Sequence, residues 1–331
     1  MKNLSRRDFV SMGSLALGAV ITHTASASSI FQSKGKRIGI IGLDTSHAVA
    51  FTKSLHDSPE KFRDYKVVAA YPYGTRTIPS ATDRIPKYIT DIEQLDVKIV
   101  DSIQALLKQV DYVLLETNDG RLHLEQAREV FKAKKPVFID KPIAASYKDA
   151  KEIIRLSTEH KVPFFSSSSL RYITGMKDIL EGKYGKVLGA DVYSPATIEP
   201  SHPDFFWYGI HAVEMLITAM GVGCKSLNRT HTEGTDIIVG VWDDGRVGTV
   251  RGTRTGASAF GGTIYCEKAA VKLGDFVGYA PLLEEIVGFF ESGKVPVDGQ
   301  QTLEICAFIE AADLSKNRHG QSVNLTEITL K

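Results

Sequence analysis

The residue in this sequence best suited to catalysis is Lys141. It follows a short apolar run, Pro136 to Ile139, which predicts a buried parallel strand. Open α/β sheets bind their ligands at the carboxyl ends of such strands. An ammonium group there can donate a hydrogen bond to a substrate oxygen, and burial would lower its pKa toward the range of an acid or base. The alternative is a surface lysine in an Asp-Lys-Pro turn.

His211 is the second predicted catalytic residue. It opens a predicted helix after the aromatic run Phe205 to Tyr208, and imidazole transfers protons near neutral pH. Glu214 lies one turn further on the same helix face and could orient it. A histidine satisfied at a domain interface is the alternative. His202, His211 and Glu214 are also zinc or iron ligand types, but a loop places His202, so we predict no metal site.

The turn after the first predicted strand is the candidate site for a dinucleotide. Such a turn needs Gly-x-Gly-x-x-Gly, so that the backbone can approach a diphosphate. Residues 42–47 read Gly-Leu-Asp-Thr-Ser-His, which keeps Gly42 alone of the three glycines. Asp44 adds bulk and negative charge at the second position, and His47 replaces the third glycine. Because Asp, Thr and Ser also cap helices, a capped turn that binds no phosphate is the alternative.

Alternating strands and helices must position these residues. The pattern predicts a Rossmann-type, doubly wound parallel sheet of the α/β class. The predicted strands are 37–42, 66–71, 97–100, 111–116, 136–139 and 162–165; the helices are 48–55, 103–110, 122–134 and 147–160; and 72–86 is a loop. After about residue 185 the strands lengthen and alternate, which predicts an α+β domain with an open, mainly antiparallel sheet and helices on one face, at 207–220, 281–292 and 302–317.

Several short motifs resemble those of the Gfo/Idh/MocA family of sugar and polyol oxidoreductases. That family has Thr-Pro-Asn, then His, then Glu-Lys-Pro; this chain has Thr117-Asn118, His123 and Asp140-Lys141-Pro142. Arg171-Tyr172 and Gly209-Ile210-His211 resemble later family motifs. The family's Asp four residues before the last His is Trp207 here, and Asp204 lies nearby.

The resemblance implies NAD or NADP as cofactor and a sugar or sugar derivative as substrate. The predicted cofactor-binding residues are Gly42, Asp44, Thr45, Ser46, His47, Thr117, Asn118, His123, Asp140 and Lys141. The predicted substrate-binding residues are Arg171, Tyr172, Asp204, Trp207, Tyr208 and His211. The resemblance is also the reason to expect a homo-oligomer through the C-terminal sheet.

The first residues read as an export signal. Arg6-Arg7 is followed by a small apolar stretch, 12–21, and by Ala25-Ser26-Ala27, in the order of a twin-arginine signal peptide. We therefore expect export by that route to the periplasm, with residues 1–27 removed and no stable membrane span left. The remaining domains would be a Rossmann-like domain at 36–165 and a substrate and oligomerisation domain at 166–331.

Composition excludes several other classes of protein. The 331 residues carry 40 basic and 39 acidic side chains, a formal charge of +1, which provides no field for nucleic acid. Three scattered cysteines make no disulfide framework. We therefore favour a nicotinamide-dependent oxidoreductase acting on a sugar. The alternatives are a redox-neutral or cofactor-free sugar lyase or glycosidase, and a non-catalytic periplasmic sugar-binding protein.

Overall fold

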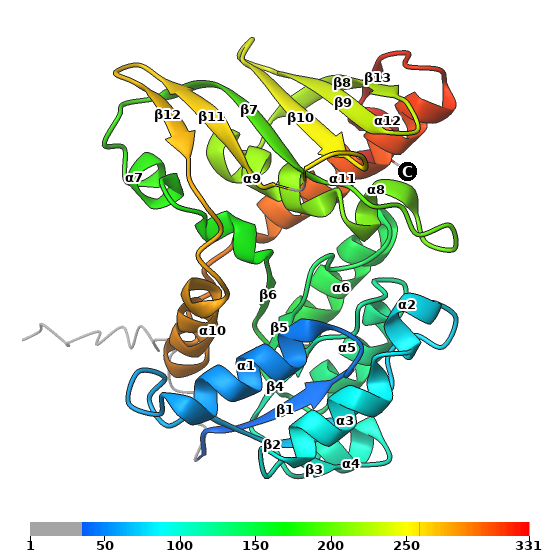
Figure 1. Ribbon diagram of the computed structural model, residues 1–331, viewed down its shortest axis with the longest axis vertical. Coiled ribbons are helices and arrows are strands. Elements are labelled where there is room, and N and C mark those ends of the chain that lie inside the picture. The colour runs from blue at the N-terminus through cyan, green and yellow to red at the C-terminus, as the bar shows by residue number, and fades with distance from the viewer. Residues whose placement is uncertain (1–34, 258, 331) are drawn as a thin grey trace, which may run out of the picture. The chain divides into compact units, whose positions relative to one another are not determined.

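The computed structural model describes residues 35–257 and 259–330, so the predicted signal segment at 1–27 lies outside the described residues. Two sheets organise the described chain (Figure 1). In this part of the chain, no helix combines the length and the apolar character that crossing a membrane requires.

The first sheet is the predicted Rossmann sheet. Its six strands lie in the order β3-β2-β1-β4-β5-β6, and every neighbouring pair is parallel. The strands are β1 (Arg37–Ile41), β2 (Lys66–Tyr71), β3 (Lys98–Ile99), β4 (Tyr112–Leu115), β5 (Val137–Ile139) and β6 (Phe164–Ser166). All residues of β4 and β5 are buried, because helices cover both faces of a doubly wound sheet.

The helices around this sheet begin where the sequence supplies caps. They are α1 (Ser46–Asp57), α2 (Pro79–Thr82), α3 (Ile85–Glu93), α4 (Ile103–Leu107), α5 (His123–Lys132) and α6 (Tyr147–His160). The Thr45 side chain accepts a hydrogen bond from the His47 backbone N–H and starts α1, and Ser146 caps α6 in the same way. The predicted loop at 72–86 is wrong in part, since Pro79 and Pro86 start two helices within it.

The second sheet is open and mainly antiparallel, as predicted. Its order is β12-β11-β7-β10-β9-β8-β13, with a parallel pair, β7 and β10, at its centre. The strands are β7 (Val187–Pro195), β8 (Cys224–His231), β9 (Thr235–Trp242), β10 (Val247–Thr253), β11 (Gly261–Cys266), β12 (Ala270–Leu273) and β13 (Val323–Asn324). Helices α9 (Ile210–Met220) and α11 (Gly299–Asn317) share its buried core.

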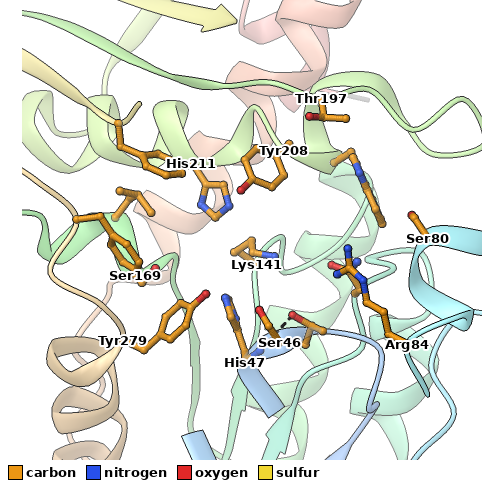
Figure 2. Close-up of a pocket in the computed structure, with 16 residues that line it drawn as sticks. Ser46, His47, Ser80, Arg84, Lys141, Ser169, Thr197, Tyr208, His211 and Tyr279 are labelled. Carbon is orange, nitrogen blue, oxygen red and sulfur yellow. Dashed lines mark hydrogen bonds between the residues drawn. The ribbon is translucent and has the colours of Figure 1, made fainter. Parts of the chain in front are cut away.

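One helix predicted over 207–220 is two helices in the structure. The short α8 (Asp204–Trp207) ends before Gly209, and α9 begins after it. A Cβ at position 209 would lie 2.3 Å from the Phe205 ring. Glycine therefore lets α8 fold closely against the start of α9, and Tyr208 and His211, on either side of it, point toward Lys141 (Figure 2).

The last part of the chain returns to the first sheet. Helix α10 (Ala280–Ser292) buries Leu282, Leu283 and Ile286 in the same core as Ile38 of β1 and Phe51 of α1. The remaining short elements are η2 (Ser169–Tyr172), α7 (Met176–Leu180) and α12 (Thr326–Thr329). This return of the chain to the first sheet places Tyr279, just before α10, at the carboxyl edge of that sheet, where it lines the cavity described below.

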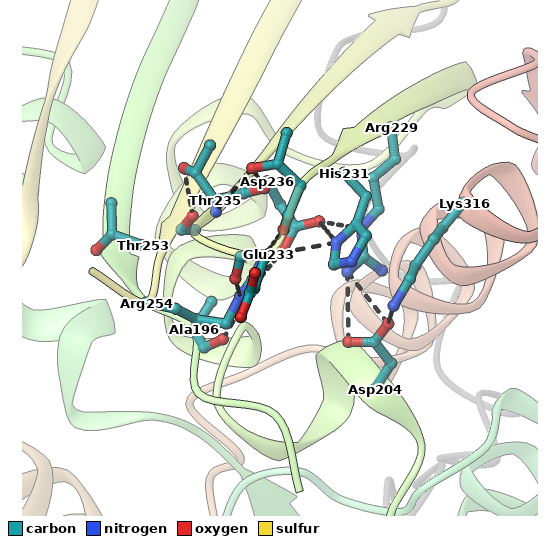
Figure 3. A network of polar contacts seen from close by, with 12 residues as sticks. Ala196, Asp204, Arg229, His231, Glu233, Thr235, Asp236, Thr253, Arg254 and Lys316 are labelled. Atoms are coloured by element: carbon teal, nitrogen blue, oxygen red, sulfur yellow. Dashed lines mark hydrogen bonds and ion pairs between the residues drawn. The ribbon is translucent and has the colours of Figure 1, made fainter. Parts of the chain in front are cut away.

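A buried ion network holds the second sheet to its helices (Figure 3). Arg229 of β8 has a fully buried side chain that pairs with Asp236 at 2.8 Å, Asp313 at 2.6 Å and Asp204 at 3.2 Å. Its guanidinium also lies over the ring of Phe205, 4.6 Å from the centroid. The network therefore joins β8, β9, α8 and α11 through one cation.

We expect Arg229→Met to lower the free energy of unfolding by about 3–5 kcal/mol, because removing one partner leaves buried carboxylates without their counter-charge. Urea denaturation measures this loss. Arg251→Met, on the exposed side of β10, is the control and should change stability by less than about 0.5 kcal/mol. Equal losses in the two variants would contradict the role given to the network.

Candidate functional site

A cavity of about 410 Å³ lies at the carboxyl edge of the first sheet, a size usual for small-molecule sites (Figure 2). The first sheet and its helices contribute one wall, and η2, α8, α9 and the segments before β11 and α10 contribute the other. Its lining is Thr45, Ser46, His47, Ser80, Arg84, Asn118, Lys141, Ser169, Leu170, Thr197, Trp207, Tyr208, His211, Phe260, Phe276 and Tyr279.

Lys141 lies at the centre of this cavity, directly after β5 and before a cis peptide bond to Pro142. Its Nζ is 3.4 Å from Asp140 Oδ2, and the side chain is 9% exposed. Burial lowers the pKa of Lys141, but the adjacent Asp140 carboxylate outweighs burial, so the net change is upward. The expected lowering of this pKa is therefore wrong, and Lys141 is a charged hydrogen-bond donor rather than a neutral base.

His211 faces Lys141 from the first turn of α9. Its Nδ1 lies 2.7 Å from Ser168 Oγ, and burial lowers its pKa well below the usual value. Glu214 reaches it indirectly: one carboxylate oxygen accepts from the Ser168 backbone N–H at 2.8 Å, and the other from Ser167 Oγ and Arg171 Nε. The site thus places a neutral, oriented imidazole opposite a charged ammonium group.

The Asp44 side chain does not enter the cavity. It is fully buried, and its oxygens accept hydrogen bonds from the backbone N–H groups of Thr75 and Asn118, both at 3.0 Å. Burial raises its pKa to about 6. Asp44 therefore ties together the loops that follow β2 and β4, and the residues that line the cavity at the start of α1 are Thr45 and Ser46.

His47 and two buried carboxylates meet beneath the cavity. His47 Nδ1 lies 3.1 Å from Asp140 Oδ1 and 3.8 Å from Glu116 Oε2. The ring stacks on Phe51 and meets the edge of Tyr279. Burial raises the pKa of Asp140, but His47 and Lys141 outweigh burial and hold this pKa well below its usual range. Burial and the nearby Asp140 carboxylate raise the pKa of Glu116 well above its usual range.

The cavity brings together eight of the residues predicted for the site. These are Thr45, Ser46, His47, Asn118, Lys141, Trp207, Tyr208 and His211. Gly42 and Thr117 lie behind them in close contact, since a Cβ on Gly42 would be 2.6 Å from the Thr117 backbone nitrogen. His123 is buried, with its ring nitrogens near the carbonyl oxygens of Thr117 and Pro142.

Three predicted substrate residues do not line the cavity. Arg171 pairs with Glu214 and Gln301, and Tyr172 packs against the core of the first sheet. Asp204 bonds Arg229 and Lys316, so it belongs to the network of Figure 3 and does not replace the carboxylate missing at Trp207. The three residues of the alternative metal site, His202, His211 and Glu214, do not come together. His202 lies near Asp119 and Trp207. His211 and Glu214 instead bond Ser168 and Ser167.

Sequence reasoning missed Ser80, Arg84, Phe260, Phe276 and Tyr279. Ser80 lies in α2 and Arg84 immediately before α3, where a loop was predicted. The aromatic three come from the segment between β10 and α10, whose return to the first sheet has no local sequence signal. Glu116 was visible at the end of a predicted strand, but only the fold shows that it faces His47 and Asp140.

Residues 36–168 match the family model GFO_IDH_MocA, described as an oxidoreductase family with an NAD-binding Rossmann fold. These residues are therefore similar to the NAD-binding domain of that family. The resemblance drawn from the sequence is thereby confirmed, and the predicted fold class agrees with it.

Curated relatives match this chain over a limited length. The 2,7-anhydro-N-acetylneuraminate hydratase of Escherichia coli is 35% identical over 95 residues, which are 27% of this chain and 25% of that protein. The alignments with the first curated relatives span about a quarter of those proteins, 25–28% of their length.

Solved structures share the fold of this chain over most of its length. A probable dehydrogenase from Thermotoga maritima superposes with a TM-score of 0.72 at 20% identity, covering 88% of this chain and 99% of that one. Scyllo-inositol dehydrogenase from Lactobacillus casei, solved with NAD(H) and scyllo-inositol, superposes with a TM-score of 0.69 at 15% identity, with the same coverage of both chains. At these identities the likeness establishes the fold alone.

The residues over α1 fit the diphosphate of a dinucleotide. The cavity places Thr45, Ser46, Ser80 and Asn118 near the N-terminus of a 12-residue helix, with the Arg84 guanidinium beside them. Helix N-termini, hydroxyl groups and arginine are the donors that phosphates take. The carboxylate usual after β2 is absent, because Tyr71-Pro72-Tyr73 stands there.

His211 should make the stability of the protein depend on pH. Below about pH 6.5 the unfolded histidine takes up a proton that the buried folded one does not, so stability is lost as the pH falls. One such group changes the free energy of unfolding by at most about 1.4 kcal/mol per pH unit. We expect the stability gap between the wild type and His211→Gln, from urea denaturation, to be smaller at pH 5.5 than at pH 7.5; a constant gap would contradict the burial of a neutral His211.

Proposed function

We propose that the protein is a nicotinamide-dependent oxidoreductase that acts on a sugar or polyol. The observation that carries this proposal is that a charged Lys141 lies opposite a neutral His211 in one cavity. The other end of this cavity offers hydrogen-bond donors suited to a phosphate. The Gfo/Idh/MocA match and the inositol dehydrogenase neighbour support the same reaction class.

Thr45, Ser46, Asn118 and Arg84 would hold the dinucleotide, which when bound supplies the hydride acceptor or donor. Lys141 donates a hydrogen bond to the reacting hydroxyl oxygen and stabilises the negative charge that develops there. His211, held by Ser168 through Nδ1, presents Nε2 to receive the hydroxyl proton. Trp207 and Tyr208 offer flat apolar faces on which a sugar ring can pack.

The first experiment asks whether the protein carries a dinucleotide. Natively exported protein is denatured, and the released small molecules are identified by mass spectrometry; added NAD(H) and NADP(H) are then titrated onto the native protein. We expect NAD or NADP at up to one per chain, or saturable binding. Neither retention nor binding would overturn the proposal.

The second experiment tests Lys141 with the most active member of a panel of sugars and inositols. Lys141→Met should lower kcat by about 10²-fold or more, because the charge that stabilises the alkoxide is lost. Lys151→Met, exposed on α6, is the control and should leave kcat unchanged. A kcat of Lys141→Met within about twofold of the wild type would contradict the role of Lys141.

Redox-neutral chemistry on a sugar is the second candidate function. It is favoured by the missing carboxylate after β2 and by curated relatives named as hydratases of an anhydro sugar. A tightly retained dinucleotide together with turnover that produces no free reduced cofactor would select this candidate over the first.

We further propose export by the twin-arginine route and assembly through the second sheet. The export proposal rests on the motif at residues 5–27 alone. For assembly, the exposed face of the sheet carries large apolar side chains from four adjacent strands, namely Tyr193, Val241, Val247 and Tyr265. Light scattering should give at least twice the monomer mass, and Val241→Lys combined with Val247→Lys, a directly paired couple on that face, should return the monomer.

A further inference from the structure

Glu116 is a buried carboxylate that the proposed mechanism does not use. It follows β4 directly, is 0% exposed, and neither of its oxygens has a hydrogen-bond partner. Every other fully buried Asp or Glu among the described residues bonds at least one donor; Asp44 accepts two backbone N–H groups, and Glu214 accepts from Ser167, Ser168 and Arg171. Such an orphaned group in a native core calls for an explanation.

The neighbouring basic residues, Lys141 and His47, do not supply that explanation. Lys141 pairs with Asp140 at 3.4 Å, and His47 Nδ1 lies nearer to Asp140, at 3.1 Å, than to Glu116, at 3.8 Å. If Glu116 were ionised it would be a second buried anion with little counter-charge. If it were neutral, its O–H would have no acceptor. Both states cost free energy in a dry interior, and a further cation would remove the cost.

We propose that His47, Glu116 and Asp140 bind a divalent transition-metal ion, with Zn²⁺ as the best fit. One ligand atom from each residue lies within 4.8 Å of the other two, as ligands that share one ion require. One imidazole and two carboxylates are ligand types that Zn²⁺ accepts, and three protein ligands leave a position open for another group.

The sheet itself builds this group. His47 lies in the first turn of α1, Glu116 directly follows β4 and Asp140 directly follows β5. The carboxyl ends of β1, β4 and β5 are adjacent in the parallel order. His47 stands where a dinucleotide fingerprint has its third glycine, so this ligand is a departure of this chain from that pattern. The two oxygens of Asp140 face different partners, Oδ1 toward His47 and Oδ2 toward Lys141.

The site borders the cavity, because both His47 and Lys141 line it. A zinc ion there would add Lewis-acid character beside the substrate. Metal binding does not depend on the proposed oxidoreduction and is measured without dinucleotide or sugar, so the failure of one proposal is distinguishable from the failure of the other.

The test uses the full-length protein, treated with a chelator, dialysed and titrated with ZnCl₂ by calorimetry, with thermal melting in parallel. We expect one Zn²⁺ per chain and a rise in Tm on its addition. Glu116→Gln and His47→Gln should each weaken binding by at least about tenfold and abolish the rise in Tm. The matched controls Glu129→Gln and His56→Gln, outside the group, should bind as the wild type does.

MnCl₂ is the second probe, and binding that shows the same dependence on Glu116 and His47 supports the proposal for a divalent ion. Anomalous diffraction from crystals grown with ZnCl₂ locates the ion if a variant fails to fold, and density between the three side chains supports the site. Absence of stoichiometric binding of both metals to the wild type, unchanged affinity in both variants, or an ion located elsewhere would overturn the proposal.

Discussion

The buried negative charge of Asp140 is the interaction on which the rest of the site depends. Its backbone N–H donates to Leu115 at 2.8 Å, so the parallel pairing of β4 and β5 fixes where the carboxylate lies. One oxygen faces Lys141 and keeps it charged, and the other faces His47. A buried ion of this kind is stable only with its partners in place, which couples the protonation of Lys141 to the packing of α1 and β5.

The opposing wall is organised by a second buried carboxylate, Glu214. It joins the serines after β6 to Arg171 of η2, and Ser168 in turn fixes the ring of His211. Each wall thus has one carboxylate that positions one functional side chain: Asp140 holds a cation and Glu214 holds a neutral imidazole. Because α10 returns to the first sheet, the aromatic residues before it, including Tyr279, complete the cavity between the two walls.

The turn after β1 departs from a common dinucleotide-binding turn in a particular way. The side chain that replaces the second glycine is buried and fastens the loops after β2 and β4, instead of projecting into the cavity. The side chain that replaces the third glycine points to two carboxylates beneath the floor. Both substitutions add polar groups below the cavity, while Thr45 and Ser46 still line it, so a row of hydroxyl groups lies above a cluster of ionisable groups.

The sequence by itself determined the parallel sheet, the mainly antiparallel second sheet, the helices at 147–160 and 281–292, and the nomination of Lys141 and His211. These follow from local periodicity, capping residues and the rule that ligands meet the carboxyl ends of parallel strands. Only the tertiary structure decided the charge of Lys141, the place of Asp204 in the Arg229 network, and the meeting of His47 with Glu116. The physical reason is that ionisation and side-chain pairing depend on burial and on neighbours from distant elements, and residues 47, 116 and 140 become neighbours only when the order of strands β1, β4 and β5 is set.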